Sequence, residues 1–286
     1  MSFDLNQLLD YLHTERIQGN QFEGKILPGE RPAVFGGQVF AQSLDAAIQT
    51  VDADRRAHSI HGHFLRAGDI SQPIVFDVVE LRTGRSFATR QVIATQDGKT
   101  IFQATVSFQT PEQGLSHQQA APTSVDRDTM VSEEAYWQEI RQHRANMHQL
   151  RPTDFSALEI LGNFRRDFTE PQTGEPKQQL WLKANGTLTA DSNDHRLVLA
   201  FMSDMHLLTT ALQAHPYTFA CGKIQQASLD HTVWFYEDID VCNWLYYDMH
   251  SPVSAGARGL NHGYFYTETG KLVAAASQEG LIRVRD

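Results

Sequence analysis

Residues 228–236 place a hydroxyl, a carboxylate and an imidazole close together, on Ser228, Asp230 and His231. Proteins use these groups as nucleophiles and as general acids or bases. Side chains alternate between the two faces of an extended chain. The predicted faces are Leu229, Val233 and Phe235 on one side, and Ser228, Asp230 and Thr232 on the other. The same pattern is typical of a half-buried strand with solvated polar groups, so the stretch alone does not establish a site.

Asp230 and His231 are neighbours on this predicted strand, and their side chains therefore point to opposite faces. We expect them to make separate structural hydrogen bonds rather than to act as an acid and base pair. Three more histidines, His58, His61 and His63, resemble a metal-binding cluster. Only His61 and His63 share a strand face, and no nearby carboxylate completes a ligand set. We therefore predict no metal ion and no cofactor.

Several known catalytic motifs are missing from the sequence. It contains no Gly-x-Ser-x-Gly string, which disfavours the α/β-hydrolase route to ester cleavage. It also lacks Gly-x-Gly-x-x-Gly, and Gly98-Lys99-Thr100 is not a phosphate-binding loop because Ile93 occupies the position of the required upstream glycine.

The composition is that of an ordinary globular protein. The chain has 286 residues, 41% of them hydrophobic, and a mean hydropathy of −0.39. A formal net charge of −10 argues against nucleic acid as a partner. No apolar run approaches the length of a membrane span, and residues 1–4 lack the features of a signal peptide. Two cysteines, Cys221 and Cys242, fit a reducing compartment. We therefore expect a cytoplasmic protein.

The first half predicts two helices followed by an antiparallel meander. Leucines at helical spacing from Leu5 to Leu12, with Ser2 or Asp4 as a cap, indicate a short amphipathic helix. A second helix opens at Phe35-Gly36-Gly37-Gln38 and is apolar or small on most sides, so we expect it to be enclosed. The Asp97-Gly98 pair predicts a hairpin. The strands expected here are residues 58–65, 74–82, 87–95 and 100–108.

The middle of the chain is typical of a connector. Residues 111–122 are rich in Gln, Ser, Pro and Ala, and residues 132–150 predict a charged, exposed helix with Glu133 and Glu134 in its first turn. We predict domains at residues 1–112 and 179–286, joined by a connector at residues 113–178.

The second half repeats the plan of the first. A helix is predicted to begin near Ser203-Asp204, and a second Gly-Lys hairpin, Gly270-Lys271, lies about 170 residues after Gly98-Lys99. The strands expected here are residues 226–236, 244–251, 257–267 and 272–283. The sequence therefore predicts an internal duplication of a helix wrapped by an antiparallel sheet.

Several short strings, in order along the chain, carry a resemblance to a known family. They are Val34-Phe35-Gly36-Gly37-Gln38-Val39, His63-Phe64-Leu65-Arg66-Ala67-Gly68-Asp69, Gly84-Arg85-Ser86-Phe87, Ser203-Asp204, Leu229-Asp230-His231-Thr232-Val233-Trp234-Phe235, Ala257-Arg258-Gly259 and Gln278-Glu279-Gly280. Together they resemble acyl-CoA thioesterase II, the TesB-like family. The match runs from about residue 10 to the C-terminus and is weakest between residues 111 and 177.

This resemblance implies an α+β double hot-dog fold, in which each of two tandem repeats wraps a central helix in an antiparallel sheet. It also implies hydrolysis of fatty acyl-CoA to a free fatty acid and coenzyme A. The implied catalytic residues are Asp204 at the start of the second central helix, Ser228 on the following strand and Gln278 on the last strand. Some members of the family have Thr where this chain has Ser228. Homodimers or homotetramers are the implied assemblies.

The chemistry of a thioester agrees with these residue types. A carboxylate such as that of Asp204 accepts a proton from water, while the hydroxyl of Ser228 and the amide of Gln278 hold the water in line. The N-terminus of the Asp204 helix, or that of the Gly36-Gly37 helix, supplies amides for the oxyanion. The first repeat has no carboxylate where the second has Asp204, so one site per chain is expected.

Each residue also has a structural interpretation. Asp204 suits a helix cap, and Ser228 and Gln278 suit solvated strand positions. Candidate contacts for the phosphates of coenzyme A are Arg82, Arg85, Arg90 and Arg258. Two other functions remain open, an acyl-CoA hydratase or dehydratase on the same fold and a non-catalytic acyl-CoA-binding protein.

Overall fold

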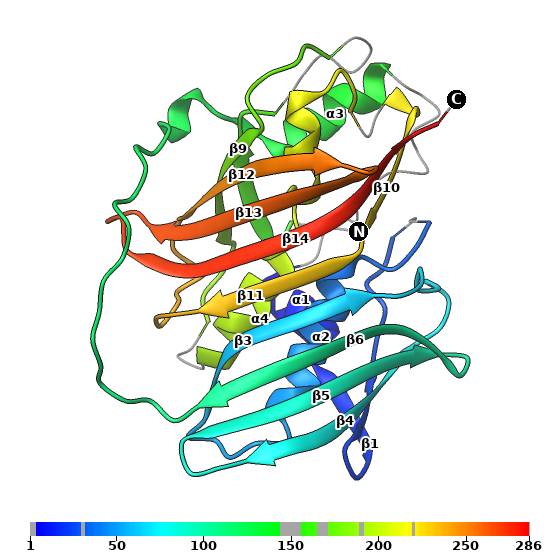
Figure 1. Cartoon of the computed structure of the whole chain (residues 1–286), viewed down its shortest axis with the longest axis vertical. Helices are drawn as coiled ribbons and strands as arrows, with labels where there is room; N and C mark the ends of the chain where they lie inside the picture. The colour runs from blue at the N-terminus through cyan, green and yellow to red at the C-terminus, as the bar shows by residue number, and fades with distance from the viewer. Residues whose placement is uncertain are drawn as a thin grey trace.

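The computed structural model describes residues 4–29, 32–143, 156–164, 171–188, 192–218 and 221–285. Within these residues the strands form one 14-stranded antiparallel sheet that curves around two central helices (Figure 1). This architecture confirms the predicted α+β double hot-dog fold. The predicted helix at residues 132–150 appears as α3 (Glu133–His143), and residues 144–150 lie outside the described part.

The first half contains α1 (Leu5–Leu12), α2 (Gly36–Ile48) and six strands. Asp4 caps α1 in a capping box with Gln7, as its position before the leucine stripe predicts. Helix α2 is buried along almost its whole length, which confirms that it is enclosed. The strands are β1 (Thr14–Gln18), β2 (Gln21–Gly24), β3 (Arg56–Phe64), β4 (Ile74–Thr83), β5 (Phe87–Gln96) and β6 (Lys99–Gln109).

The predicted hairpin between β5 and β6 is also confirmed. Asp97 and Gly98 both have positive φ, at 47° and 68°. Two positive φ values in a two-residue turn define type I′, whose twist matches that of the flanking strands.

The second half contains α4 (Ser192–Ser203), the 3₁₀ segment η3 (Leu208–Ala214) and most of the remaining strands. A further 3₁₀ segment, η1 (Arg127–Thr129), lies in the connector. The strands are β7 (Val131–Ser132), β8 (Leu158–Gly162), β9 (Lys177–Ala184), β10 (Ile224–Ser228), β11 (Asp230–Phe235), β12 (Leu245–Ala255), β13 (Arg258–Thr267) and β14 (Leu272–Val284). Strand β8 pairs with β9, so part of the predicted connector belongs to the sheet.

The second central helix differs from the prediction. The sequence placed its start near Ser203-Asp204, whereas α4 ends at Ser203 and only the shorter η3 follows. The chain breaks between them at His206, whose φ of 61° no α-helix adopts. The whole segment Asn193–Ala214 is long and apolar enough to cross a membrane, but 72% of its apolar window is buried inside the protein. It forms part of the core of this fold.

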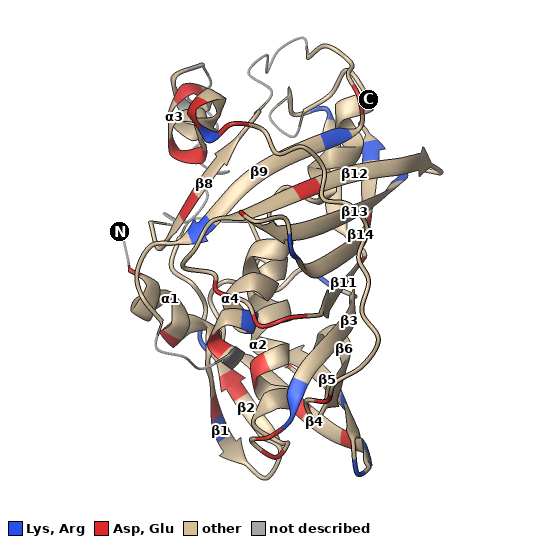
Figure 2. Cartoon of the chain, turned by 90° about the vertical axis from the view of Figure 1, so that its left-hand side faces the viewer, with Lys and Arg blue, Asp and Glu red and all other residues tan. Residues whose placement is uncertain are grey.

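The two halves meet along the strand pair β3–β11 and along the contacts of α4 with α2 and α1. Strands β3 and β11 are antiparallel, and Thr232 lies opposite His61. Helices α2 and α4 pack together beneath this joint (Figure 2). His13 reinforces the packing by bonding Asp45 of α2 at 2.9 Å and Asp194 of α4 at 3.2 Å. Hydrogen bonds to Asp194 and Asp45 raise the pKa of His13 to about 10.

The duplication is visible in the strand register. The shift in pairing at Ala94/Thr95, between β5 and β6, recurs at Phe265/Tyr266 between β13 and β14. His61 and Thr232 are separated by the same 171 residues, and they pair with each other. A pseudo-two-fold axis therefore passes through this pair.

Candidate active site

Asp204 lies at the break between α4 and η3, directly after the last residue of α4. This location overturns the expectation that Asp204 begins a helix. The carbonyl end of α4 faces this region, so α4 supplies no amide donors for an oxyanion. The apolar spacing of Leu207, Leu208, Ala211 and Leu212 continues past the break and hides it in the sequence.

The N-terminus of α2 meets Asp204 instead. A Cβ built on Gly36 would lie 2.8 Å from Oδ2 of Asp204, so the missing side chain allows this close approach. Phe35 precedes the helix without capping it through a side chain. Since the first amides of a helix have no partner within the helix, the positive end of α2 lies beside the carboxylate.

Gln278 of β14 is fully buried and bonds directly to Asp204. Its Nε2 donates to Oδ1 of Asp204 at 2.5 Å and lies 3.3 Å from Nδ1 of His231. The structure therefore joins two of the three predicted catalytic residues. Oε1 of Gln278 is buried and has no partner among the described atoms.

Ser228 is not bonded to either of them. It ends β10 opposite Gly280, two residues beyond Gln278 on the same face of β14. Thr232 lies opposite Ser277, on the other face, so the break at Leu229 turns Ser228 to the inner side. The sequence expected Ser228 and Thr232 to share a face, and the irregularity between β10 and β11 overturns that expectation. No hydrogen bond of the Ser228 hydroxyl is found among the described contacts.

His231 belongs to the same network, although the sequence assigned it only a separate structural bond. The ring is fully buried, and its Nε2 lies 2.8 Å from Oγ of Ser203. Burial lowers the pKa of His231, against the opposing charges of Asp204 and Asp230. One signal in the sequence pointed to this position. His231 lies two residues from the apolar Val233 on the same strand, which places the imidazole on the inner face of the sheet. Asp230 accepts a separate bond from the Glu279 amide at 2.7 Å, as predicted.

Two further polar residues on the inner face were missed. Asn261 of β13 lies opposite Gln278 and is fully buried, and its Oδ1 has no partner among the described atoms. The hydroxyl of Tyr247 donates to the carbonyl of Ser203 at 2.8 Å, which fixes the end of α4. Neither residue belongs to a recognisable string, and only the strand register brings them together.

The arginines suggested for coenzyme A lie in different environments. Arg90 is 2% exposed and bonds to Thr50, just beyond the C-terminus of α2. It is therefore a structural residue at the opposite end of α2 from Asp204. Arg258 is exposed and lies nearer the site, where its Nε is 3.0 Å from a carboxylate oxygen of Glu279.

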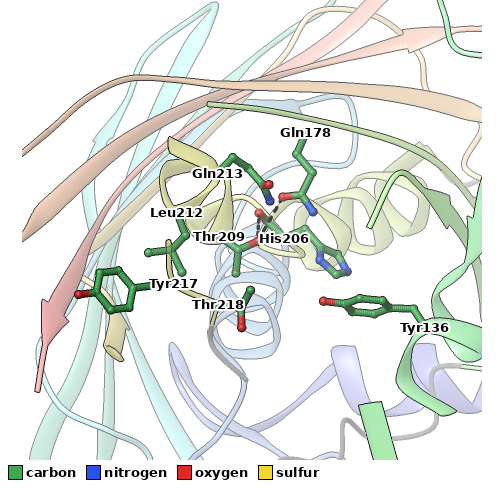
Figure 3. Close-up of a pocket in the computed structure, with 8 residues that line it drawn as sticks. All are labelled: Tyr136, Gln178, His206, Thr209, Leu212, Gln213, Tyr217 and Thr218. Carbon is green, nitrogen blue, oxygen red and sulfur yellow. Dashed lines mark hydrogen bonds between the residues drawn. The ribbon is translucent and has the colours of Figure 1, made fainter. Parts of the chain in front are cut away.

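A small cavity of about 30 Å³, with a mixed polar and apolar lining, lies beside η3 and α3 (Figure 3). This volume suits one or two water molecules. His206 borders it, and its Nε2 lies 2.5 Å from a carboxylate oxygen of Glu133. The pair ties the connector helix to the turn that carries Asp204. The residues that line the cavity are Tyr136, Gln178, His206, Thr209, Leu212, Gln213, Tyr217 and Thr218.

Among the residues that the structure describes, no cluster of three or more His, Cys, Asp or Glu side chains is arranged to hold a metal ion. The site combines the half-buried carboxylate of Asp204, a primary amide, a helix N-terminus and a nearby hydroxyl. This set is suited to general-base activation of water and to stabilising an oxyanion.

Comparison with known proteins gives consistent matches over nearly the whole chain. The family model described as acyl-CoA thioesterase matches residues 149–281, and that of the acyl-CoA thioesterase N-terminal domain matches residues 27–109. Acyl-CoA thioesterase 2 of Haemophilus influenzae is 35% identical over 99% of each chain. Acyl-coenzyme A thioesterase 8 of Mus musculus is 34% identical over 100% of this chain and 92% of the mouse protein.

Solved structures show the same relationship. The acyl-CoA thioesterase II TesB2 of Mycobacterium marinum superposes with a TM-score of 0.78, at 36% identity over 98% of each chain. The dehydratase domain of PpsC from Mycobacterium tuberculosis superposes with a TM-score of 0.59 at 13% identity, over 96% of this chain and 99% of that domain. The second likeness is one of fold alone.

Proposed function

Because this chain belongs to the acyl-CoA thioesterase family, and hydrolyses acyl-CoA to a free acid and coenzyme A, we propose that a water molecule beside Asp204 performs the attack. The observation that carries this proposal is the 2.5 Å bond from Gln278 to Asp204 at the N-terminus of α2. It joins a proton acceptor, an amide and a helix dipole at one point.

The proposed reaction needs no covalent intermediate with the protein. Asp204 accepts a proton from water through Oδ2, since Oδ1 is engaged by Gln278. The water oxygen bonds to the thioester carbonyl carbon, and the first-turn amides of α2 at Gly36 and Gly37 stabilise the oxyanion. The carbon–sulfur bond then breaks, and coenzyme A leaves as a thiolate that takes up the proton. Ser228, on the same inner face as Gln278, orients the water.

One such site per chain is proposed, and the pseudo-symmetry supports it. In the first half, the paired residues Ile60 and Val106 are the structural equivalents of His231 and Gln278 in the second half. Ala57 is likewise the equivalent of Ser228. All three first-half residues are buried and apolar, so these positions contain no hydroxyl, imidazole or amide side chain.

The test is a thiol-trapping assay on acyl-CoAs of graded chain length. We expect free thiol from the wild type, and a loss of about two to four orders of magnitude in kcat for Asp204→Asn. Because Asn is nearly isosteric with Asp, the unfolding midpoint serves as the control for folding. Undiminished activity in this variant would refute the assigned role of Asp204.

The same assay addresses the other two functions. A hydratase would change the double bond of an enoyl-CoA without releasing thiol, and a binding protein would retain acyl-CoA without turnover. Release of thiol from saturated acyl-CoA contradicts both. The chain length that gives the highest kcat/KM would identify the preferred substrate.

Three coarser features complete the proposal. We propose hot-dog repeats at residues 1–112 and 179–286 joined by a connector at residues 113–178, whose strands β7 and β8 extend the sheet of the second repeat, and assembly as a homodimer or homotetramer. The chain acts in the cytoplasm, which is consistent with the free thiols of Cys221 and Cys242. Among the described residues, the one segment long and apolar enough to cross a membrane, Asn193–Ala214, is mostly buried inside the protein.

A further inference from the structure

We infer that His231 is a positioning residue, which as the neutral Nε2–H tautomer orients the amide of Gln278 so that Oε1 is free to accept a hydrogen bond from the reacting water. This inference rests on the proposed function, because it assigns His231 a part in holding the same water. A short chain of hydrogen bonds from Ser203 through His231 and Gln278 to Asp204 fixes the position of each proton.

The hydroxyl of Ser203 has one proton, which it donates to the carbonyl of Ala200 at 2.8 Å. The same oxygen lies 2.8 Å from Nε2 of His231, so in this second contact it can only accept. The proton between these two residues therefore belongs to the imidazole, and Nε2 is its N–H.

Gln278 contacts the other ring nitrogen of His231. A neutral imidazole has one N–H, so Nδ1 of His231 is an acceptor and receives a bond from Nε2 of Gln278 at 3.3 Å. The remaining proton of that Nε2 is donated to Asp204 at 2.5 Å. Both protons of the Gln278 amide are then used within the protein, and its oxygen is left without a partner.

The opposite tautomer does not fit this arrangement. An N–H at Nδ1 would require Gln278 to present its oxygen to His231, which is a half-turn of the amide. Oε1 would then stand about where Nε2 stands now, against the carboxylate of Asp204, and two acceptors would face each other. The imidazolium would have the same effect, because it also has a proton on Nδ1.

The surroundings hold the ring in place and keep it neutral. Phe40 of α2 contacts the imidazole edge to face, with the ring centres 4.6 Å apart. Tyr247 fixes the backbone of Ser203 through its carbonyl. The charged groups that act on the ring are Asp204 and Asp230, and burial outweighs their effect on its pKa.

The fold itself does not require a histidine here. Ile60 occupies the equivalent place in the first half, on β3, and is fully buried there. An aliphatic side chain thus satisfies the same strand position in the same sheet. The imidazole is present in the half that contains Asp204 and Gln278, which favours a role in orienting Gln278.

Two variants separate orientation from packing. Asn places its amide near the position of Nδ1, and Gln places its amide nearer that of Nε2. For His231→Asn we expect kcat within about 5-fold of the wild type, because an acceptor for Gln278 remains. For His231→Gln we expect a loss of about 10- to 100-fold in kcat with KM nearly unchanged. Equal kcat in the two variants would overturn the inference.

A direct measurement does not depend on whether the variants fold. The ¹⁵N chemical shifts of the imidazole in the wild-type protein report which nitrogen is protonated. We expect protonated Nε2 and unprotonated Nδ1 at neutral pH. A proton on Nδ1 would overturn the inference even if Asp204→Asn is inactive. Full activity of Asp204→Asn would instead refute the role proposed for Asp204, and it would have no bearing on the tautomer of His231.

Discussion

Among the three residues proposed to hold the water, Ser228 is the one whose side chain is free to change rotamer. Asp204 and Gln278 fix each other through a bond of 2.5 Å, whereas the Ser228 hydroxyl has no partner among the described contacts. A serine hydroxyl that lacks a bond samples its three rotamers, and only some of them can point toward the water.

We therefore expect Ser228→Thr to retain the activity of the wild type or to exceed it by a few-fold. The added methyl restricts χ1 and keeps the hydroxyl. Ser228→Ala should lose about 10- to 100-fold in kcat, because the hydroxyl no longer orients the water. Steady-state kinetics of the two variants provide the test. Equal activity of the alanine variant and the wild type would exclude Ser228 from the reaction.

At the scale of single residues, the sequence identifies groups better than it identifies their partners. Asp204, Ser228 and Gln278 were found through strings that resemble a family, and the first and last of them are in contact. The roles of His231 and Asn261 depend on which residues lie opposite on β14. Strand register results from long-range pairing, which a local string does not encode.

At the scale of elements, the site depends on the meeting of two helix ends of opposite polarity. The N-terminus of α2 faces the turn that follows α4, and Asp204 lies between them. The absence of a side chain at Gly36 permits this contact. Helix α2 was predicted from its apolar pattern, whereas α4 was not. The sequence therefore predicted only one of the two helix ends that meet at Asp204.

For Gly36→Ala we expect a loss of about 10- to 100-fold in kcat with little change in the unfolding midpoint. The new Cβ would stand 2.8 Å from Oδ2 of Asp204 and 3.0 Å from the ring of Phe64, so the carboxylate must move. Gly114→Ala is the matched control, since a Cβ there meets nothing within 4 Å. If both variants match the wild type in kcat, α2 is not part of the site.

The strands show where prediction from the sequence succeeds. The meander β3 to β6 was located because its strands are long, alternate regularly and include an Asp-Gly turn. Strands β1, β2 and β8 were missed because they are short, and their burial depends on pairing with β4 and β9. The break at His206 was missed because the apolar stripe of the helix continues across it.

At the scale of the whole molecule, the duplication determines where chemistry is possible. Two halves with the same strand register surround one buried polar network, and the equivalent place in the first half has Ala57, Ile60 and Val106. The general plan was visible in the sequence through the spacing of the two Gly-Lys hairpins. The axis through His61 and Thr232 was not, because it exists only in the pairing of β3 with β11.

From the pairing of β3 with β11 we also predict that the peptide link between the halves is dispensable once the protein has folded. Residues 113–116 are exposed and outside the regular elements, and Leu115 is fully exposed. A protease site inserted there should yield two fragments that elute together and release thiol at the rate of the uncut protein, because the sheet and the α2–α4 contact hold them. Separation of the fragments on a sizing column would contradict this. Such a chain could be produced in two pieces and reconstituted as one enzyme.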